Sequence, residues 1–166
     1  MKKVIIAVAF MLGVSTVNAQ TFEKGTSVVQ AGIGLGSSFG TPIGLGYEYG
    51  MSEKIGLGAY VGYASQSYSV PFFGDYKVTN ILVGVKGNYH FFQSDKIDAY
   101  GGLLLGYDVA SSKWTTANTI AIPTTYGGIV FGGSVGARYY FTDNIAAFAE
   151  LGYGLGYLNA GLAYKL

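Results

Sequence analysis

The sequence predicts an all-β protein, an antiparallel up-and-down barrel of eight strands, and three observations carry that prediction. From Thr26 onward, apolar residues recur at every second position, which is the period of a strand with two different faces. The chain contains 27 Gly, 15 Tyr and 10 Phe but only 3 Pro. Three similar polar turns divide the alternating segments into hairpins. Because glycine weakens helices by about 1 kcal/mol per site relative to alanine, this composition favours strand pairing over helix packing.

The N-terminus is expected to be a secretory signal peptide covering residues 1–19. Lys2 and Lys3 precede an apolar run over 4–14, and small residues lead up to Ala19. Because a membrane-spanning helix needs about 20 apolar residues, we favour a cleaved signal over a retained anchor. Cleavage after Ala19 would leave 147 residues (166 minus 19), which we assign to one barrel domain, 20–166.

Charge and cysteine content exclude several kinds of site. Removing Lys2 and Lys3 changes the formal net charge from +1 to −1, so we expect no nucleic-acid partner. The chain has no cysteine, and its one histidine stands among dispersed carboxylates. We therefore expect no disulfide, no metal site and no cofactor.

One parity of each expected strand is apolar, whereas the other parity is mostly glycine or polar. In the third expected strand, for example, the apolar parity holds Ile55, Leu57, Ala59, Val61 and Tyr63. The apolar parities define these eight segments: 29–35, 43–49, 55–63, 81–91, 97–107, 129–141, 145–153 and 158–166. Strands of roughly 9 to 14 residues suit a tilted crossing of a bilayer, and an even number places both termini on one side.

The connections between these segments alternate in length. The three short turns, near residues 50–54, 92–96 and 142–144, each follow an aromatic strand end and precede an isoleucine. The other side is expected to carry loops at 36–42, 65–77 and 110–126 and a short link at 154–157. By the usual topology of membrane barrels, the short turns are periplasmic and the longer loops extracellular.

Aromatic residues cluster at the ends of the apolar face rather than at its centre. Rings with a polar tip prefer the headgroup level of a bilayer, so these residues predict two girdles. The girdle residues are Tyr47, Tyr49, Tyr89, Phe91, Tyr139, Phe141 and Tyr164 at one interface, and Tyr63, Tyr107 and Tyr153 at the other. We therefore favour a transmembrane barrel over a soluble barrel or sandwich, whose outer face would be glycine-rich and nearly uncharged.

The signal, the eight alternating strands and the closing segment 159–166 resemble the small outer-membrane barrels of the OmpA/OmpX type. The resemblance covers essentially the whole mature chain. It implies a location in the outer membrane, contact with its lipid, and recognition of the C-terminal strand by the β-barrel insertion machinery. The terminal Leu166 departs from the phenylalanine that is usual in this signal.

The opposite parity places charged residues inside the barrel. Three acids and three bases share this face: Glu48, Asp98 and Glu150 with Lys86, Arg138 and Lys165. Because the lumen of an eight-stranded barrel is just wide enough for side chains to fill it, we expect a paired network rather than a conducting pore. A narrow channel past Glu150 and Arg138 is the alternative.

The turns also predict partners, because residues opposite each other across a hairpin have a constant index sum. If Phe91 faces Ile97, then His90 faces Asp98. If Phe141 faces Ile145, then Arg138 faces Phe148 and lies diagonal to Glu150, within reach of the guanidinium group.

His90 also raises an enzymatic interpretation, because some small outer-membrane barrels modify lipids with a histidine and a serine. Those activities act in the outer leaflet, whereas His90 lies near a periplasmic turn with Asp98 as its expected partner. We therefore expect a structural His90 and no catalytic residues.

Two expected loop segments are unusually apolar and are candidates for contact with a partner. They contain Phe72, Phe73, Tyr76 and Trp114. One interpretation is adhesion to an unidentified extracellular ligand; the other is that these residues extend the strands above the membrane or touch the outer leaflet. The sequence therefore favours a structural or surface-interaction barrel, then a small-solute channel, then a lipid-modifying enzyme.

Overall fold

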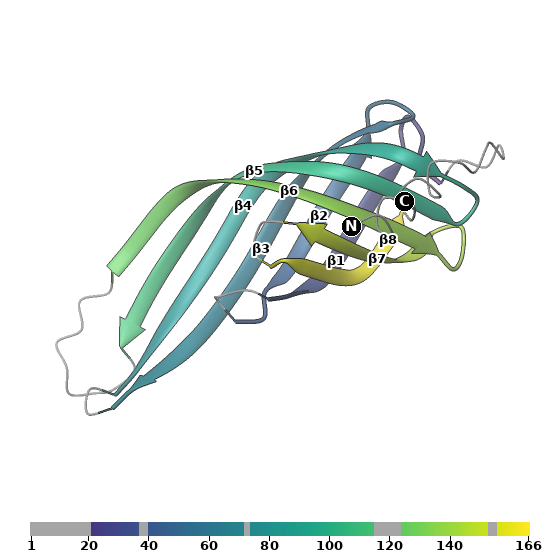
Figure 1. Cartoon of the computed structure of the whole chain (residues 1–166). Coiled ribbons are helices and arrows are strands. Elements are labelled where there is room, and N and C mark those ends of the chain that lie inside the picture. Colours follow the sequence, from purple (N-terminus) through teal and green to yellow (C-terminus); the bar gives the residue numbers. More distant parts are fainter. Residues whose placement is uncertain (1–20, 37–39, 72–73, 115–123, 153–155) are drawn as a thin grey trace, which may run out of the picture.

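The structure, a computed structural model, describes residues 21–36, 40–71, 74–114, 124–152 and 156–166. These residues form eight strands that close into an antiparallel barrel, so the predicted fold class is confirmed (Figure 1). The strands are β1 (Ser27–Leu35), β2 (Ile43–Gly50), β3 (Ile55–Val70), β4 (Gly74–Gln93), β5 (Ile97–Trp114), β6 (Thr124–Tyr140), β7 (Ile145–Gly152) and β8 (Leu158–Lys165). None of the described residues belongs to a helix long and apolar enough to cross a membrane.

Each strand pairs with its neighbours in sequence, and β1 pairs with β8 to close the barrel. Following the register once around the wall from Ile129 of β6 leads through β5, β4, β3, β2, β1, β8 and β7 to Tyr139 of the same strand. The stagger is therefore 10 residues (139 minus 129) over eight strands. A closed barrel requires such a stagger, and it makes the strands tilt relative to the barrel axis.

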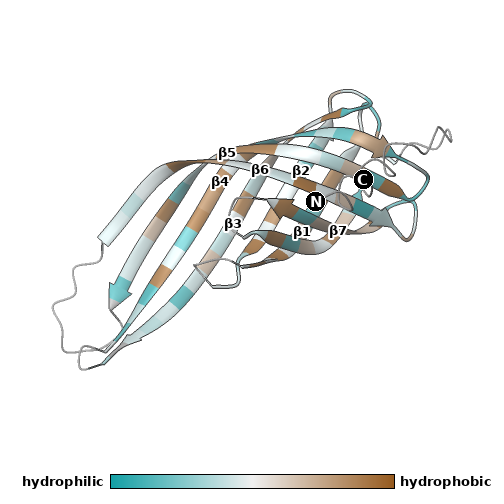
Figure 2. Ribbon diagram, in the orientation of Figure 1, coloured by the Kyte–Doolittle hydropathy of each residue, from teal (hydrophilic) through white to brown (hydrophobic). Residues whose placement is uncertain are grey.

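The apolar parity faces outward on all eight strands, as the sequence predicted. Leu45, Leu57, Val83, Leu105 and Leu162 are each more than half exposed. Hydrophobic residues recur along the barrel wall, and hydrophilic residues gather at the turns and at the far ends of the long strands (Figure 2). A continuous apolar outer surface is the property that places a barrel in lipid.

The strands differ in length, which the sequence did not predict. Strands β3 to β6 have 16 to 20 residues, whereas β1, β2, β7 and β8 have 8 or 9. The four long strands therefore continue past the end of the short ones as a projecting sheet (Figure 1).

The projecting sheet corrects two predicted loops. Most of 65–77 is β3 and β4 paired from Ser65↔Thr79 to Val70↔Gly74, with Gly74 at φ +93°. Residues 110–114 and 124–126 likewise belong to β5 and β6. The predicted strands stopped where the outward apolar parity stopped. Beyond that point the outward residues are polar and rings such as Tyr68 and Tyr76 lie on the inward parity, but the backbones still pair, because pairing does not require an apolar outer face.

A short N-terminal segment, residues 21–26, folds across the end of the barrel that carries the short turns. The Gly25 amide donates to the Gly50 carbonyl at 2.9 Å, and the Thr26 amide donates to Glu23 at 3.1 Å. Thr21 and Phe22 are buried. The segment therefore covers this mouth of the lumen.

Candidate functional site

The candidate site is a cluster of charged side chains in the lumen, supplied by five strands. Because side chains alternate across a strand, the residues whose neighbours face lipid must point inward. The cluster takes Glu48 from β2, Lys86 and His90 from β4, Asp98 from β5, Arg138 from β6 and Glu150 from β7. All but Lys86 are fully or almost fully buried.

The lower part of this cluster lies near the short turns and is centred on Arg138. Its guanidinium group donates to Asp98 at 3.2 Å, to Glu48 at 2.5 Å and to Gln30 at 2.9 Å. His90 bridges the same two carboxylates, with Nδ1 2.6 Å from Asp98 and Nε2 3.0 Å from Glu48. Two acids and two bases thus form a closed ring of contacts, which offsets the cost of burying each charge.

Glycines on the inner face make room for this ring. A Cβ on Gly56 would collide with the carboxylate of Glu48, and a Cβ on Gly58 would collide with the backbone of Tyr47. Glycine at position 56 therefore makes room for the buried Glu48 carboxylate, and glycine at position 58 for the neighbouring backbone.

The upper part of the cluster is a single ion pair. Lys86 Nζ lies 2.6 Å from Glu150 Oε1, and the Tyr100 hydroxyl donates to the same oxygen at 2.8 Å. The Tyr100 ring lies between the two parts, with Arg138 Cζ 4.6 Å from its centroid. The two parts are therefore joined through one aromatic side chain.

The predicted neighbours of Arg138 are present, but its hydrogen-bond partners are different. Arg138 lies opposite Phe148 and diagonal to Glu150, as predicted, but its hydrogen bonds go to Asp98, Gln30 and Glu48 rather than to Glu150. The direct reason is that Asp98 faces Arg138 across β5 and β6. No short turn joins β5 to β6, so the index sums across the short turns do not relate Asp98 to Arg138.

The predicted contact between His90 and Asp98 is present, although the predicted register is wrong. A bulge between His90 and Phe92 shifts the pairing, so His90 lies opposite Tyr100 and Asp98 lies opposite Gln93. Both side chains still point into the lumen, where they meet.

The other predicted site residues lie apart from the cluster. Lys165 is on the inner parity but packs over the Tyr140 ring, 5.3 Å from its centroid. Tyr76 is in β4 and stacks on Tyr68 with centroids 5.1 Å apart. Phe72, Phe73 and the side chain of Trp114 lie outside the described residues.

Sequence reasoning missed Phe22. Its ring stacks on His90 with centroids 3.7 Å apart and an interplanar angle of 10°. Phe22 precedes the first alternating segment, so strand periodicity could not find it; the only available signal was an aromatic residue close after the expected cleavage site.

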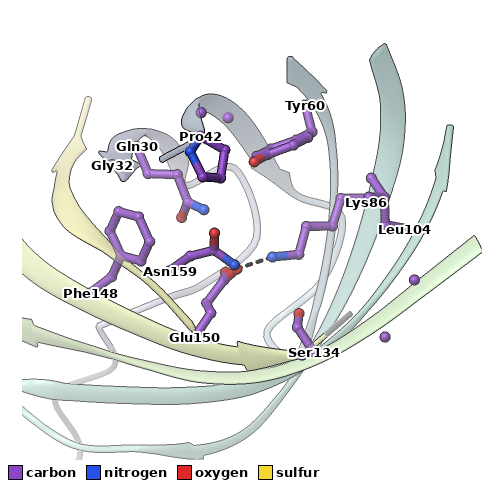
Figure 3. A pocket seen from close by; sticks show the side chains of 15 residues that line it. Gln30, Gly32, Pro42, Tyr60, Lys86, Leu104, Ser134, Phe148, Glu150 and Asn159 are labelled. Atoms are coloured by element: carbon purple, nitrogen blue, oxygen red, sulfur yellow. Dashed lines mark hydrogen bonds and ion pairs between the residues drawn. The ribbon is translucent and has the colours of Figure 1, made fainter. Parts of the chain in front are cut away.

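Two small cavities lie above the buried ring. The larger has a volume of about 50 Å³ and is bounded by Gln30, Tyr60, Phe148 and the Lys86–Glu150 pair, which surround an open space (Figure 3). The smaller, about 10 Å³, reaches down to Glu48 and Arg138 and shares Gln30, Tyr60 and Lys86 with the larger. The larger volume is enough for a few water molecules, and the smaller is close to the minimum for one.

No protein-family model matches the chain, and no curated protein matches it. Solved structures do match. OprG from Pseudomonas aeruginosa is 12% identical with a TM-score of 0.64, over 90% of this chain and 99% of OprG. The N-terminal barrel domain of Pseudomonas aeruginosa OprF is 18% identical with a TM-score of 0.60, over 86% of this chain and 98% of that domain.

Ail, the attachment invasion locus protein of Yersinia pestis, is 14% identical with a TM-score of 0.53, over 86% of this chain and 99% of Ail. The match covers nearly the full length of each of these barrels. The chain therefore has the fold of the eight-stranded outer-membrane β-barrels.

Proposed function

We propose that this chain is an outer-membrane barrel, exported by cleavage after Ala19, that acts at the cell surface through its projecting sheet and does not conduct solutes. The unequal length of the strands is the observation that carries the proposal. The ends of β3 to β6 extend away from the short turns and from the C-terminal end of β8. In the usual topology this is the extracellular side.

The projecting sheet has features of a contact surface. On its inner parity, Tyr68 and Tyr76 form a stacked pair near the tip. Along 124–133, β6 pairs with β5, while its described pairing with β7 begins only at Ser134. An edge of this kind can accept an extended segment of another chain. Ail, which shares the fold, has been crystallised in complex with the heparin analogue sucrose octasulfate, and this supports a test with a sulfated polysaccharide.

A hairpin truncation tests this role. Residues 67–77 are replaced by Asn-Gly, which joins the paired residues Gln66 and Val78 by a two-residue turn and keeps the register. Gram-negative cells that display the wild-type protein are compared with cells that display the truncated protein for attachment to cultured cells and to immobilised sulfated polysaccharide. We expect truncation to abolish attachment while the barrel still folds; equal attachment by both proteins contradicts the proposal.

The closed lumen is supported by the buried ring and by Phe22, which fill the barrel near the short turns. One observation supports the alternative of a narrow channel: two adjoining cavities reach from the upper lumen to Arg138. Single-channel recording in planar bilayers decides between them, with Glu150→Ala/Arg138→Ala as the comparison. We expect a silent wild type; reproducible steps that the double variant alters would establish the channel.

The proposal assigns no catalytic role to His90. Both of its ring nitrogens contact carboxylates, and Phe22 stacks on its face. A lipid-modifying site would need a serine at one of those nitrogens and an opening to lipid. The described contacts of His90 supply neither.

A further inference from the structure

On the outward face of the projecting sheet, residues paired between neighbouring strands form rows. From one row to the next towards the tip, the side chains change from apolar to hydroxyl-bearing and then to basic. Tyr63, Ile81 and Val109 lie side by side on β3, β4 and β5 and form the last apolar row. The next outward row carries a hydroxyl on each of the four long strands: Ser65, Thr79, Ser111 and Thr125. We expect the boundary between hydrocarbon and headgroups at this change from an apolar row to a row of hydroxyls.

The row beyond the hydroxyls holds two lysines. Lys77 of β4 lies directly opposite Lys113 of β5, and both are exposed on the outward face. These are the two basic residues of the outer half of the barrel, since the other eight of the ten lie near the N-terminus, in the short turns or on the inner parity: Lys2, Lys3, Lys24, Lys54, Lys96, Lys86, Arg138 and Lys165.

This juxtaposition is unfavourable without an anion, because like charges directly opposite each other in a sheet destabilise it. Among the described residues, the ion pairs within 4 Å include neither Lys77 nor Lys113. Asp75 lies on the same face, two residues nearer the tip, where it faces Ser69. One carboxylate does not neutralise two ammonium groups, so the row keeps a positive charge.

The height of the lysine row matches the headgroup layer. On β4 the outward apolar stretch from Tyr89 to Ile81 spans nine residues (89 minus 81, plus one), which suits a tilted crossing of the hydrocarbon core. Lys77 lies four residues beyond Ile81 (81 minus 77), or about 13 Å along the strand before tilt is considered. A lysine at this height can keep its stem near the acyl chains and its ammonium among phosphates.

We propose that Lys77 and Lys113 form a binding site for the phosphate groups of outer-leaflet lipid headgroups. In this site a phosphate lies between the two ammonium groups. This inference rests on the proposed orientation, with the projecting sheet outside the cell. The adjoining hydroxyls of Thr79 and Ser111 supply neutral donors beside the same position. The site would fix the height of the barrel in the membrane and attach phosphorylated glycolipid to the base of the projecting sheet.

Lipid retention tests the site. The refolded protein is equilibrated with equal amounts of phosphatidylcholine and bis-phosphorylated lipid A in micelles, and bound lipid is counted by native mass spectrometry. Lys77→Gln/Lys113→Gln is the test variant, and Lys54→Gln/Lys96→Gln, which removes two lysines from the opposite rim, is its matched control. We expect wild type and control to favour lipid A over phosphatidylcholine by about tenfold or more, and the test variant to lose that preference.

Three further results would overturn the lysine site, its lipid ligand or the proposed orientation. Equal retention of lipid A by the test variant and the wild type overturns the site. Displacement of lipid A by inorganic phosphate at equal concentration would assign the lysines to a soluble anion rather than to a lipid. Surface labelling of single-cysteine variants at Ser67 and Ser52 in whole cells checks the orientation of the barrel. Labelling at Ser52 rather than at Ser67 would show a reversed barrel and overturn the proposed function. A correctly oriented barrel without a preference for lipid A would overturn the lysine site alone.

Discussion

Phe22 lies flat against His90 at the end of the lumen that carries the short turns, with ring centroids 3.7 Å apart. His90 in turn contacts Asp98 and Glu48, so a residue outside the barrel wall packs directly on the charged ring inside it. The N-terminal segment is thereby part of the core rather than a free leader to β1.

Phe22→Ala is expected to destabilise the barrel, because both its own burial and the cover over His90 are lost. Truncating a buried phenylalanine to alanine costs about 3–5 kcal/mol. The measurement is the free energy of unfolding in urea with the protein in lipid vesicles. Phe91→Ala is the control, since Phe91 faces outward and is 43% exposed. A loss no larger than that of the control would show that residues 21–26 do not close the lumen.

Asp98→Asn is expected to be among the most destabilising substitutions of a charged residue. The carboxylate is fully buried and contacts both Arg138 and His90. Its neutralisation leaves the Arg138 charge with Glu48 as its remaining carboxylate partner, and breaking a buried ion pair on one side costs about 3–5 kcal/mol. Asp95→Asn, in the turn before β5, makes the same chemical change at an exposed site. Similar unfolding midpoints for the two variants would mean that the ring contributes little.

The outward parity and the eight strands could be predicted because lipid imposes a strict period of two on the wall. The length of the strands could not be predicted, since the outward parity turns polar at Ser65, Thr79 and Ser111, which nevertheless pair as strand residues. The inward charges could be assigned from parity alone. Their partners could not, because Glu48 and Arg138 come from strands that are not neighbours and meet only across the closed lumen.

Pairing across the short turns could also be predicted only in part from the constant index sum of a hairpin. The index sum across the last short turn placed Arg138 opposite Phe148 correctly. The same arithmetic failed for His90, because a bulge adds a residue to one strand and no residue type near Phe92 signals it.

The Lys86–Glu150 pair is expected to show strong coupling. Removing one partner leaves a poorly solvated charge, so Lys86→Met and Glu150→Gln should each destabilise the barrel. The double variant removes both charges and should recover most of that loss, with an interaction energy of about 0.5–3 kcal/mol. A double-mutant cycle of unfolding free energies measures it. Additive single effects would show that the pair is solvated through the cavity above it.

Strand β6 is expected to show two levels of backbone protection along its length. Residues 134–139 have β5 on one side and β7 on the other, and the Tyr140 amide donates to the Lys96 carbonyl just before β5, whereas 124–128 have β5 alone as a described partner. In a strand with one neighbour, alternate amides point away from that neighbour and exchange with water.

Residue-resolved hydrogen exchange in lipid nanodiscs should therefore find alternate fast and slow amides over 124–128 and uniformly slow amides over 134–140. Residues 98–112 of β5 are the internal control, because β4 and β6 flank them throughout. Uniform protection over 124–128 would mean that another segment pairs with this edge, which would remove it as a contact surface. Fast exchange there that becomes slow when a ligand is added would identify the edge as the place where that ligand binds.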